Sequence, residues 1–134
     1  MEAAELVRLA RAASANAYCP YSGYAVGAAL LAVSGRVYVG ANVESASYGA
    51  TICAERAALA AAVSAGERRF AAIAVAAGDA PATPCGICRQ LLAEFGDMTV
   101  IGAAATDGGF VETTLAALLP AAFTAAAIDG GAHG

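Results

Sequence analysis

The sequence predicts a single domain with an α/β sandwich architecture, and three observations lead to this prediction. The chain has 134 residues, which suffice for one compact core but not for two ordinary domains. Segments with the period of a strand alternate with segments with the period of a helix. No internal repeat or linker interrupts this alternation. We therefore expect residues 1–134 to form one domain, with a flexible tail at about 129–134.

The first third of the chain predicts a helix followed by a hairpin. Residues 2–17 carry Leu6, Leu9 and Ala13 on one helical face, and the segment CPYSGY ends this helix in a turn. Two runs at 26–33 and 36–43 then show the pattern of strands, and the dipeptide Ser34-Gly35 joins them. The period of the chain thus changes from helical to extended before residue 26.

The remaining elements alternate in type. Residues 52–65 predict a helix that Gly66 stops, and 70–77 predict a buried strand. A loop at 78–84 leads into a predicted helix at 85–95. A strand at 98–104, a turn at 106–109, an extended piece at 110–113 and a helix at 115–119 complete the prediction.

Composition and charge exclude several classes of partner. Hydrophobic residues make up 60% of the chain, much of it alanine, and a contact between subunits would use part of that surplus. The net charge is −4 and no basic run occurs, so a nucleic acid polymer is not an expected partner. Charged residues at 2, 5, 8 and 11 interrupt any export signal or membrane span. The protein is therefore expected in the cytoplasm.

Four cysteines in a reducing compartment indicate metal binding or catalysis rather than disulfides. Cys85 and Cys88 lie one turn apart where a proline loop opens into a helix, and Cys53 lies in the predicted first turn of another helix. Helix N-termini favour the thiolate form by lowering its pKa. These three thiolates can converge on one zinc ion and leave a fourth position for water.

Two other uses of the cysteines remain open at this point. A C-x-x-C pair at a helix start also occurs in thioredoxin-type redox sites. A structural Cys₄ site would recruit Cys19 as a fourth ligand, although Cys19 is more simply interpreted as a small buried side chain in a turn. The single histidine, His133, lies in the tail and is expected to have no chemical role.

Two charged residues follow Cys53. Glu55 lies two positions further along the helix, so its side chain should pass beside the ion rather than bind it, as a proton shuttle requires. Three thiolates donate much electron density and weaken the metal as a Lewis acid. Arg56 could compensate by hydrogen-bonding to the ligand sulfurs. Taken singly, both could also be ordinary solvated residues of a helix start.

The segments CAE and PCGICRQ resemble the zinc deaminase signature. More narrowly, the sequence resembles the small cytidine deaminases of pyrimidine salvage, from AYCPYSGYAVGAALL through GANVESASYGATICAER and PCGICRQLLAEF to LAALLPAAF. The resemblance implies a three-layer α/β/α sandwich with a five-stranded mixed sheet, a homotetramer with shared active sites, and one zinc ion per subunit. It also implies a hydrolytic deamination of cytidine and 2′-deoxycytidine that releases ammonia.

The resemblance assigns roles to individual residues. Cys53, Cys85 and Cys88 match the zinc ligands, and Glu55 matches the general acid and base, whereas the tuning role of Arg56 rests on its position beside Cys53 alone. The matched substrate-binding residues are Asn42 and Glu44 for the ribose hydroxyls, Tyr24 and Ala54 for the base, and Tyr48 and Phe123, which the family contributes across a subunit boundary.

Some positions depart from the family pattern. Ala41 replaces a common cysteine, Ser45 a common asparagine, and Gly23, Tyr24 and Ala25 a stretch often written with Lys, Phe and Pro. These departures leave the substrate range open. A blasticidin-type or modified-cytosine aminohydrolase is the alternative enzyme, and a non-catalytic zinc module is the alternative of another class.

Overall fold

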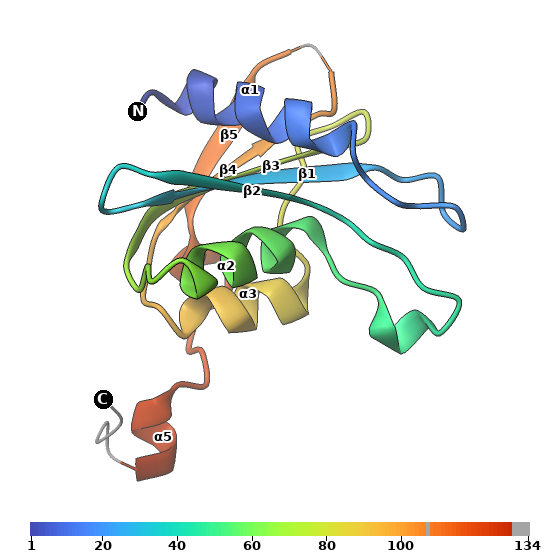
Figure 1. Cartoon of the computed structure of the whole chain (residues 1–134). Coiled ribbons are helices and arrows are strands. Elements are labelled where there is room, and N and C mark those ends of the chain that lie inside the picture. Colours follow the sequence, from blue (N-terminus) through green and yellow to red (C-terminus); the bar gives the residue numbers. More distant parts are fainter. Residues whose placement is uncertain (107, 130–134) are drawn as a thin grey trace.

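The structure is a computed structural model that describes residues 1–106 and 108–129. A five-stranded mixed sheet forms the middle layer, with α1 on one face and α2 and α3 on the other (Figure 1). The predicted three-layer α/β/α sandwich is confirmed. In chain order the elements are α1 Ala3–Ser14, β1 Val26–Ala32, β2 Val37–Ala41, the 3₁₀ turn η1 Tyr48–Ala50, α2 Ala54–Ser64, β3 Phe70–Ala77, α3 Gly86–Ala93, β4 Thr99–Ala103, β5 Phe110–Thr114, α4 Leu115–Leu118 and α5 Ala125–Asp129.

The strands lie in the order β2-β1-β3-β4-β5. Strands β3 and β4 run parallel, and every other neighbouring pair is antiparallel. The predicted hairpin of β1 and β2 is present, with Leu31 opposite Val37 and the turn closed by a hydrogen bond from the Gly35 N–H to the Ala32 carbonyl (2.9 Å). Strand β1 is buried on both faces because both layers of helices cover it.

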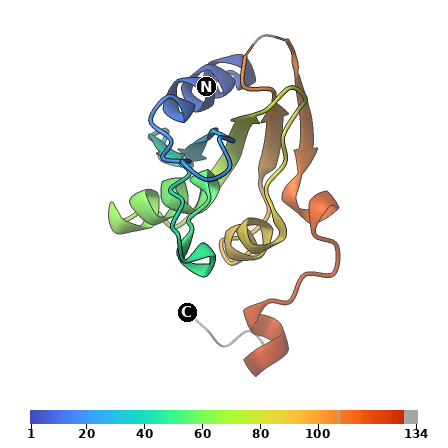
Figure 2. The same cartoon turned by 90° about the vertical axis from the view of Figure 1, so that its right-hand side faces the viewer.

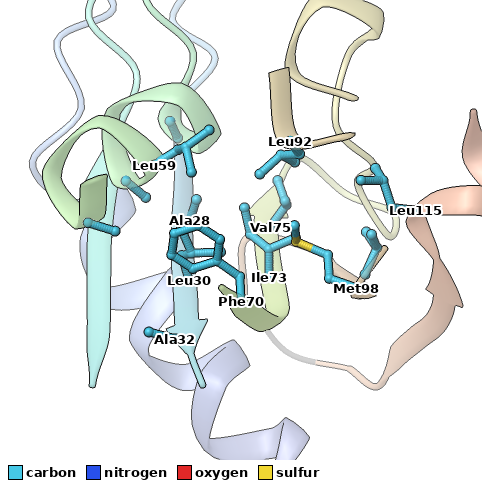
Figure 3. Close-up of a cluster of buried hydrophobic side chains, with 14 residues drawn as sticks. Ala28, Leu30, Ala32, Leu59, Phe70, Ile73, Val75, Leu92, Met98 and Leu115 are labelled. Carbon is cyan, nitrogen blue, oxygen red and sulfur yellow. The ribbon is translucent and has the colours of Figure 1, made fainter. Parts of the chain in front are cut away.

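Two hydrophobic clusters hold the layers together. One lies between the sheet and the pair α2 and α3, and combines Leu30 and Ile73 of the sheet with Leu59 and Leu92 of the helices (Figure 3). The other lies under α1, whose Leu6, Val7 and Ala10 pack on alanines of β1 and β3. Small residues allow close packing: a Cβ on Gly27 would lie 1.9 Å from the Ala10 carbonyl oxygen.

The helix ends differ from prediction by one to three residues. Helix α1 ends at Ser14, not residue 17, because the N–H groups of residues 15–17 bond to carbonyls three residues earlier, in the manner of a tightened last turn. Helix α2 ends at Ser64, one residue before the predicted end, and Gly66, with a φ of 101°, stops it just beyond the C-cap. The N–H of Gly66 bonds to Val63 and that of Glu67 to Ala62, a Schellman arrangement.

Two elements, helix α5 and the turn η1, were not predicted from the sequence. Helix α5 lies apart from the sheet and is joined to α4 by an extended segment, as Figures 1 and 2 both show. Of the tail expected at 129–134, residues 130–134 lie outside the described part of the chain, as do His133 and residue 107 of the predicted turn.

Candidate active site

Three cysteine sulfurs come together where α2 and α3 begin. The Sγ atoms of Cys53 and Cys85 are 3.7 Å apart, those of Cys85 and Cys88 are 3.5 Å apart, and all three lie within 4.8 Å of one another. Sulfurs that bind one tetrahedral zinc ion at about 2.3 Å lie about 3.8 Å from each other. The observed spacing therefore fits a single zinc ion.

The helix starts explain how the sequence brings these sulfurs together. Helices α2 and α3 lie side by side on the same face of the sheet (Figure 1), with Cys53 as the N-cap residue of α2 and Cys85 as that of α3. The prediction of Cys53 inside a helical first turn was wrong by one position. Ile52 pairs with Val43 in an isolated bridge, and this pairing keeps the chain extended until Cys53.

The structure contains no disulfide among the cysteines and leaves Cys19 out of the cluster. All four cysteines are free thiols, and sulfur separations of 3.5 and 3.7 Å exceed the roughly 2.05 Å of a disulfide bond. Cys19 is half-buried rather than buried and does not belong to the cluster, so the predicted Cys₄ alternative is wrong for the described residues. Among the described residues, no fourth cysteine joins the cluster.

The thiols of the cluster differ in acidity. Burial would raise the pKa of Cys85, but hydrogen bonds with the N–H of Cys88, with the thiols of Cys88 and Cys53 and with the N–H of Ile87 outweigh it and lower the pKa. For Cys88 burial dominates, with the charge of Glu55 next, and its pKa is raised. The helix start therefore lowers the pKa at Cys85 as expected, but the buried Cys88 needs a cation to become a thiolate.

Glu55 is a buried carboxyl group beside the cluster. It is the second residue of α2 and only 4% exposed. Burial raises the pKa of its carboxyl group, and hydrogen bonds from its own N–H, the Cys88 thiol and the Cys85 N–H, together with the charge of Arg56, offset only part of that rise. A carboxyl group with a raised pKa can accept and return a proton close to neutral pH.

Arg56, in the first turn of α2, contacts the cluster. Its Nη2 donates to the Thr51 carbonyl at 3.2 Å and to the Cys53 sulfur at 3.7 Å. The hydrogen bond to Cys53 is the main cause that raises the pKa of the guanidinium group. Within the described part of the chain, the buried Nε of Arg56 has no hydrogen-bond partner. A fixed positive charge therefore contacts the sulfurs, as the sequence predicted.

A cavity of about 310 Å³ opens beside the cysteines. It brings together most of the predicted residues: the cysteines at 53 and 85, Glu55, the backbone of the fully buried Ala54, and the polar and aromatic positions Tyr24, Asn42 and Glu44. A cavity of this size, with polar groups converging on an otherwise apolar lining, suits a small organic ligand.

Asn42 and Glu44 have well-defined partners at the end of β2. Asn42 is 7% exposed; its Oδ1 accepts from the Val26 N–H and its Nδ2 donates to the Tyr24 carbonyl, both at 2.9 Å. Glu44 accepts from the N–H groups of Tyr21 (3.0 Å) and Ser22 (3.1 Å) and from the Ser22 hydroxyl. These hydrogen bonds, the Ser22 hydroxyl first, lower the pKa of the Glu44 carboxyl group, which thus stays ionised.

Two predicted residues lie outside the cavity. Tyr48 is 77% exposed on η1 and packs edge-to-face with Tyr21 at a centroid distance of 6.3 Å. Phe123 is 62% exposed. Its carbonyl accepts a hydrogen bond from Gln90 on α3 (2.7 Å).

Sequence reasoning missed several residues that line the cavity. They are Ser22, Val26, Thr51, Val75, Ala77, Ala82 and Thr83. Thr83 stands just before Pro84 and Cys85, but its role became visible only in the structure, where its hydroxyl accepts from Arg89 (3.2 Å). The others come from the ends of strands and loops and carry no motif of their own.

No helix within residues 1–106 and 108–129 combines the length and the apolar character that crossing a membrane requires.

Comparison with known proteins places the chain in a family. Residues 1–104 match the model of the "Cytidine and deoxycytidylate deaminase zinc-binding region". The chain is 47% identical over 127 residues to a cytidine deaminase of Sporosarcina psychrophila, covering 92% of this chain and 93% of that protein. It is 48% identical over 127 residues to that of Halalkalibacterium halodurans, covering 93% and 96%.

Solved structures agree with these sequence matches. The crystal structure of cytidine deaminase from Burkholderia pseudomallei superposes with a TM-score of 0.87 at 45% identity and covers 92% of this chain and all 100% of that one. The enzyme from Mycobacterium tuberculosis gives 0.80 at 42% identity, covering 92% and 98%. The chain belongs to the cytidine and deoxycytidylate deaminase family. The matched zinc-binding region includes all three clustered cysteines, so the predicted cofactor, one zinc ion per chain, is confirmed.

Proposed function

We propose that this protein hydrolyses cytidine and 2′-deoxycytidine to uridine and 2′-deoxyuridine with release of ammonia. One observation carries the proposal: three sulfurs with the spacing of a single zinc site lie at a cavity of about 310 Å³, with the buried carboxyl group of Glu55 beside them. A site with three protein ligands and an open position is typical of catalytic zinc. Relatives that are 47% and 48% identical bear the name cytidine deaminase.

Cys53, Cys85 and Cys88 are the proposed zinc ligands. When bound, zinc would lower the pKa of a water molecule to near 7, which makes a nucleophile available at neutral pH. The sulfur separations of 3.5 and 3.7 Å support this ligand set. The raised pKa of the Cys88 thiol is consistent with it, because a bound cation would replace the proton there.

Glu55 is the proposed proton shuttle. Its carboxylate accepts a proton from the attacking water and delivers it to N3 of the pyrimidine ring while the water oxygen bonds to C4. It then transfers the second proton of the water to the amino group, the C4–N bond breaks, and ammonia leaves. Burial supports this role because it raises the pKa of the carboxyl group, which makes the group a better proton acceptor.

Arg56 is proposed to offset the negative charge of the three thiolates. Its hydrogen bond to the Cys53 sulfur at 3.7 Å supports this role. A guanidinium group that withdraws charge from a ligand sulfur restores part of the Lewis acidity that thiolates remove. Arg56 is therefore a tuning residue and does not touch the substrate.

The substrate contacts are proposed from the cavity lining. Asn42 and Glu44 bind the ribose hydroxyls, because an amide offers both a donor and an acceptor and a carboxylate accepts from a hydroxyl. Tyr24 packs on the pyrimidine ring and the backbone of Ala54 bonds to its polar edge. Both ribose-binding residues are already fixed by hydrogen bonds to the β1 start and to the loop before it.

We further propose that the chain is one domain that forms a homotetramer with shared active sites. Tyr48 and Phe123 support this, because both are large, exposed and outside the cavity of their own chain, as residues donated to a neighbouring site would be. A cytoplasmic location is proposed from the four free thiols.

Ammonia release from a substrate panel tests the function. The purified protein is incubated with cytidine, 2′-deoxycytidine, cytosine, cytidine monophosphate and blasticidin S. The proposal predicts turnover of the two nucleosides. Turnover of free cytosine alone would contradict the ribose roles of Asn42 and Glu44, and turnover of blasticidin alone would identify the alternative aminohydrolase.

A further inference from the structure

Arg89 makes three hydrogen bonds that join separate parts of the chain. It follows Cys88 on α3 and is half-buried. Its Nε donates to the Pro84 carbonyl at 2.7 Å, its Nη2 to the Thr83 hydroxyl oxygen at 3.2 Å, and its Nη1 to the Leu118 carbonyl at 2.9 Å. One guanidinium group thus contacts the loop before α3 and the end of α4.

The first two contacts hold the segment that carries Cys85 into the cluster. Pro84 is fully buried and has no N–H, so its carbonyl is the backbone group of this residue that can form a hydrogen bond. Thr83 on one side and Cys85 on the other both line the cavity. Arg89 therefore contacts the chain directly between the two residues that line the cavity.

The third contact ties this segment to the C-terminal part of the fold. The Leu118 carbonyl is the last of α4, where a helix leaves its carbonyls without internal partners and where a positive charge is favourable. Arg89 thus links the loop before α3 to the end of α4.

We propose that Arg89 is a positioning residue that sets the geometry of Cys85 in the zinc site. The inference rests on the proposed function, because it assigns Cys85 as a zinc ligand. Arg89 acts through the backbone of residues 83–85 and does not contact the sulfurs. Three acceptors in three directions require the planar fork of a guanidinium group, which a lysine ammonium group does not reproduce.

The experiment compares three variants of the zinc-loaded protein. Arg89→Ala removes all three bonds and Arg89→Lys keeps the charge but not the fork. Arg68→Ala is the matched control, because Arg68 also donates to two carbonyls, Val63 (2.9 Å) and Glu67 (2.8 Å), but at the far end of α2. The measurements are the rate of zinc transfer to a chromogenic chelator, the absorption spectrum of the cobalt(II)-substituted protein, kcat and KM for cytidine, and the thermal unfolding temperature.

The proposal predicts that Arg89→Ala releases zinc about 10 to 100 times faster than wild type and lowers kcat by a similar factor, the range typical of residues that orient metal ligands. The sulfur-to-cobalt bands should shift, and Arg89→Lys should remain closer to Arg89→Ala than to wild type. Arg68→Ala should keep the wild-type release rate and spectrum even where its unfolding temperature falls.

Two results would overturn the proposal. One is a wild-type release rate and cobalt spectrum in Arg89→Ala, and the other is full recovery in Arg89→Lys, which would make charge alone the cause. Failure of the proposed function would look different, because wild-type protein itself would then bind no zinc or release no ammonia.

Discussion

Gly40 of β2 lies directly against Ala54, the first residue of α2. A Cβ on Gly40 would be 2.5 Å from the Ala54 carbonyl oxygen and 2.5 Å from the Ala58 nitrogen. The strand backbone therefore approaches the very turn of α2 that carries Glu55 and follows Cys53. This contact fixes how close the first turn of α2, which carries Glu55, lies to the sheet.

Gly40→Ala should displace the start of α2. The added methyl group meets backbone, which cannot rotate away, so we expect a loss of stability of about 1–3 kcal/mol. We also expect a fall in kcat, because the shift moves Glu55 relative to the cysteines. Denaturant unfolding and steady-state kinetics measure the two effects. Gly109→Ala is the control, since a Cβ there meets nothing within 4 Å; equal behaviour of both variants would contradict this account.

Glu55→Gln should abolish most of the turnover while zinc stays bound. The amide cannot accept and return protons, and loss of a general acid and base costs about 10²- to 10⁴-fold in kcat. Burial penalises the charged carboxyl group, so the neutral variant should unfold at the same temperature as wild type or higher. Zinc analysis, kinetics and thermal unfolding test this. Glu112→Gln, at an exposed position of β5, provides the control; retained activity in Glu55→Gln would remove Glu55 from the mechanism.

Asn42→Ala should raise KM and also destabilise the fold. The substitution leaves the Val26 N–H and the Tyr24 carbonyl without their partner, at a cost of about 1–3 kcal/mol. The same change removes a proposed ribose ligand, so KM for cytidine should rise more than kcat falls. Asn16→Ala, at an exposed site after α1, controls for loss of an asparagine. An unchanged KM in Asn42→Ala would show that the amide serves only the fold.

The pH dependence of KM should report on Glu44. Its lowered pKa means that the ionised acceptor is present above that pKa and is lost only as the pH falls through it, below the usual carboxyl value of about 4.3. Ser22→Ala removes the largest cause of the shift, so Glu44 should protonate at a higher pH. KM for cytidine should then begin to rise at a higher pH than in wild type when the pH is lowered from about 7.

The control for this prediction is Ser34→Ala. Ser34 donates to Glu67 at 2.7 Å in a similar way, and that hydrogen bond is the main cause of the lowered pKa of Glu67, away from the cavity. In Ser34→Ala, KM for cytidine should depend on pH as it does in wild type. Profiles of wild type and Ser22→Ala that superimpose would contradict the assignment of Glu44 as an ionised ribose ligand.

The sequence predicted the elements whose signals are local. The turn at Ser34-Gly35, the helix end at Gly66 and the apolar run of β3 each depend on a few adjacent residues, and all three are present. The start of α2 was misjudged because its cause is not local: Ile52 bonds to Val43, nine residues earlier. Helix α5 lies apart from the sheet, so no packing pattern marked it in the sequence.

The residues of the candidate site also divide into those that a local motif identifies and those that only the tertiary structure shows. The cysteines, Glu55 and Arg56 share short motifs and could be named in advance. The burial of Glu55 could not, because it depends on how closely β2 and α3 cover the start of α2. Thr83 and its contact with Arg89 required the tertiary structure, since only the folded loop brings the guanidinium group back to the residue six positions earlier.

X-ray absorption at the zinc K-edge of the purified protein tests the central claim most directly. The three cysteine sulfurs lie within 4.8 Å of one another, and Cys19 is not among them. The account therefore predicts one zinc ion per chain with three sulfur neighbours at about 2.3 Å and one lighter neighbour at about 2.0 Å. Four sulfur neighbours, or two or fewer, would contradict it.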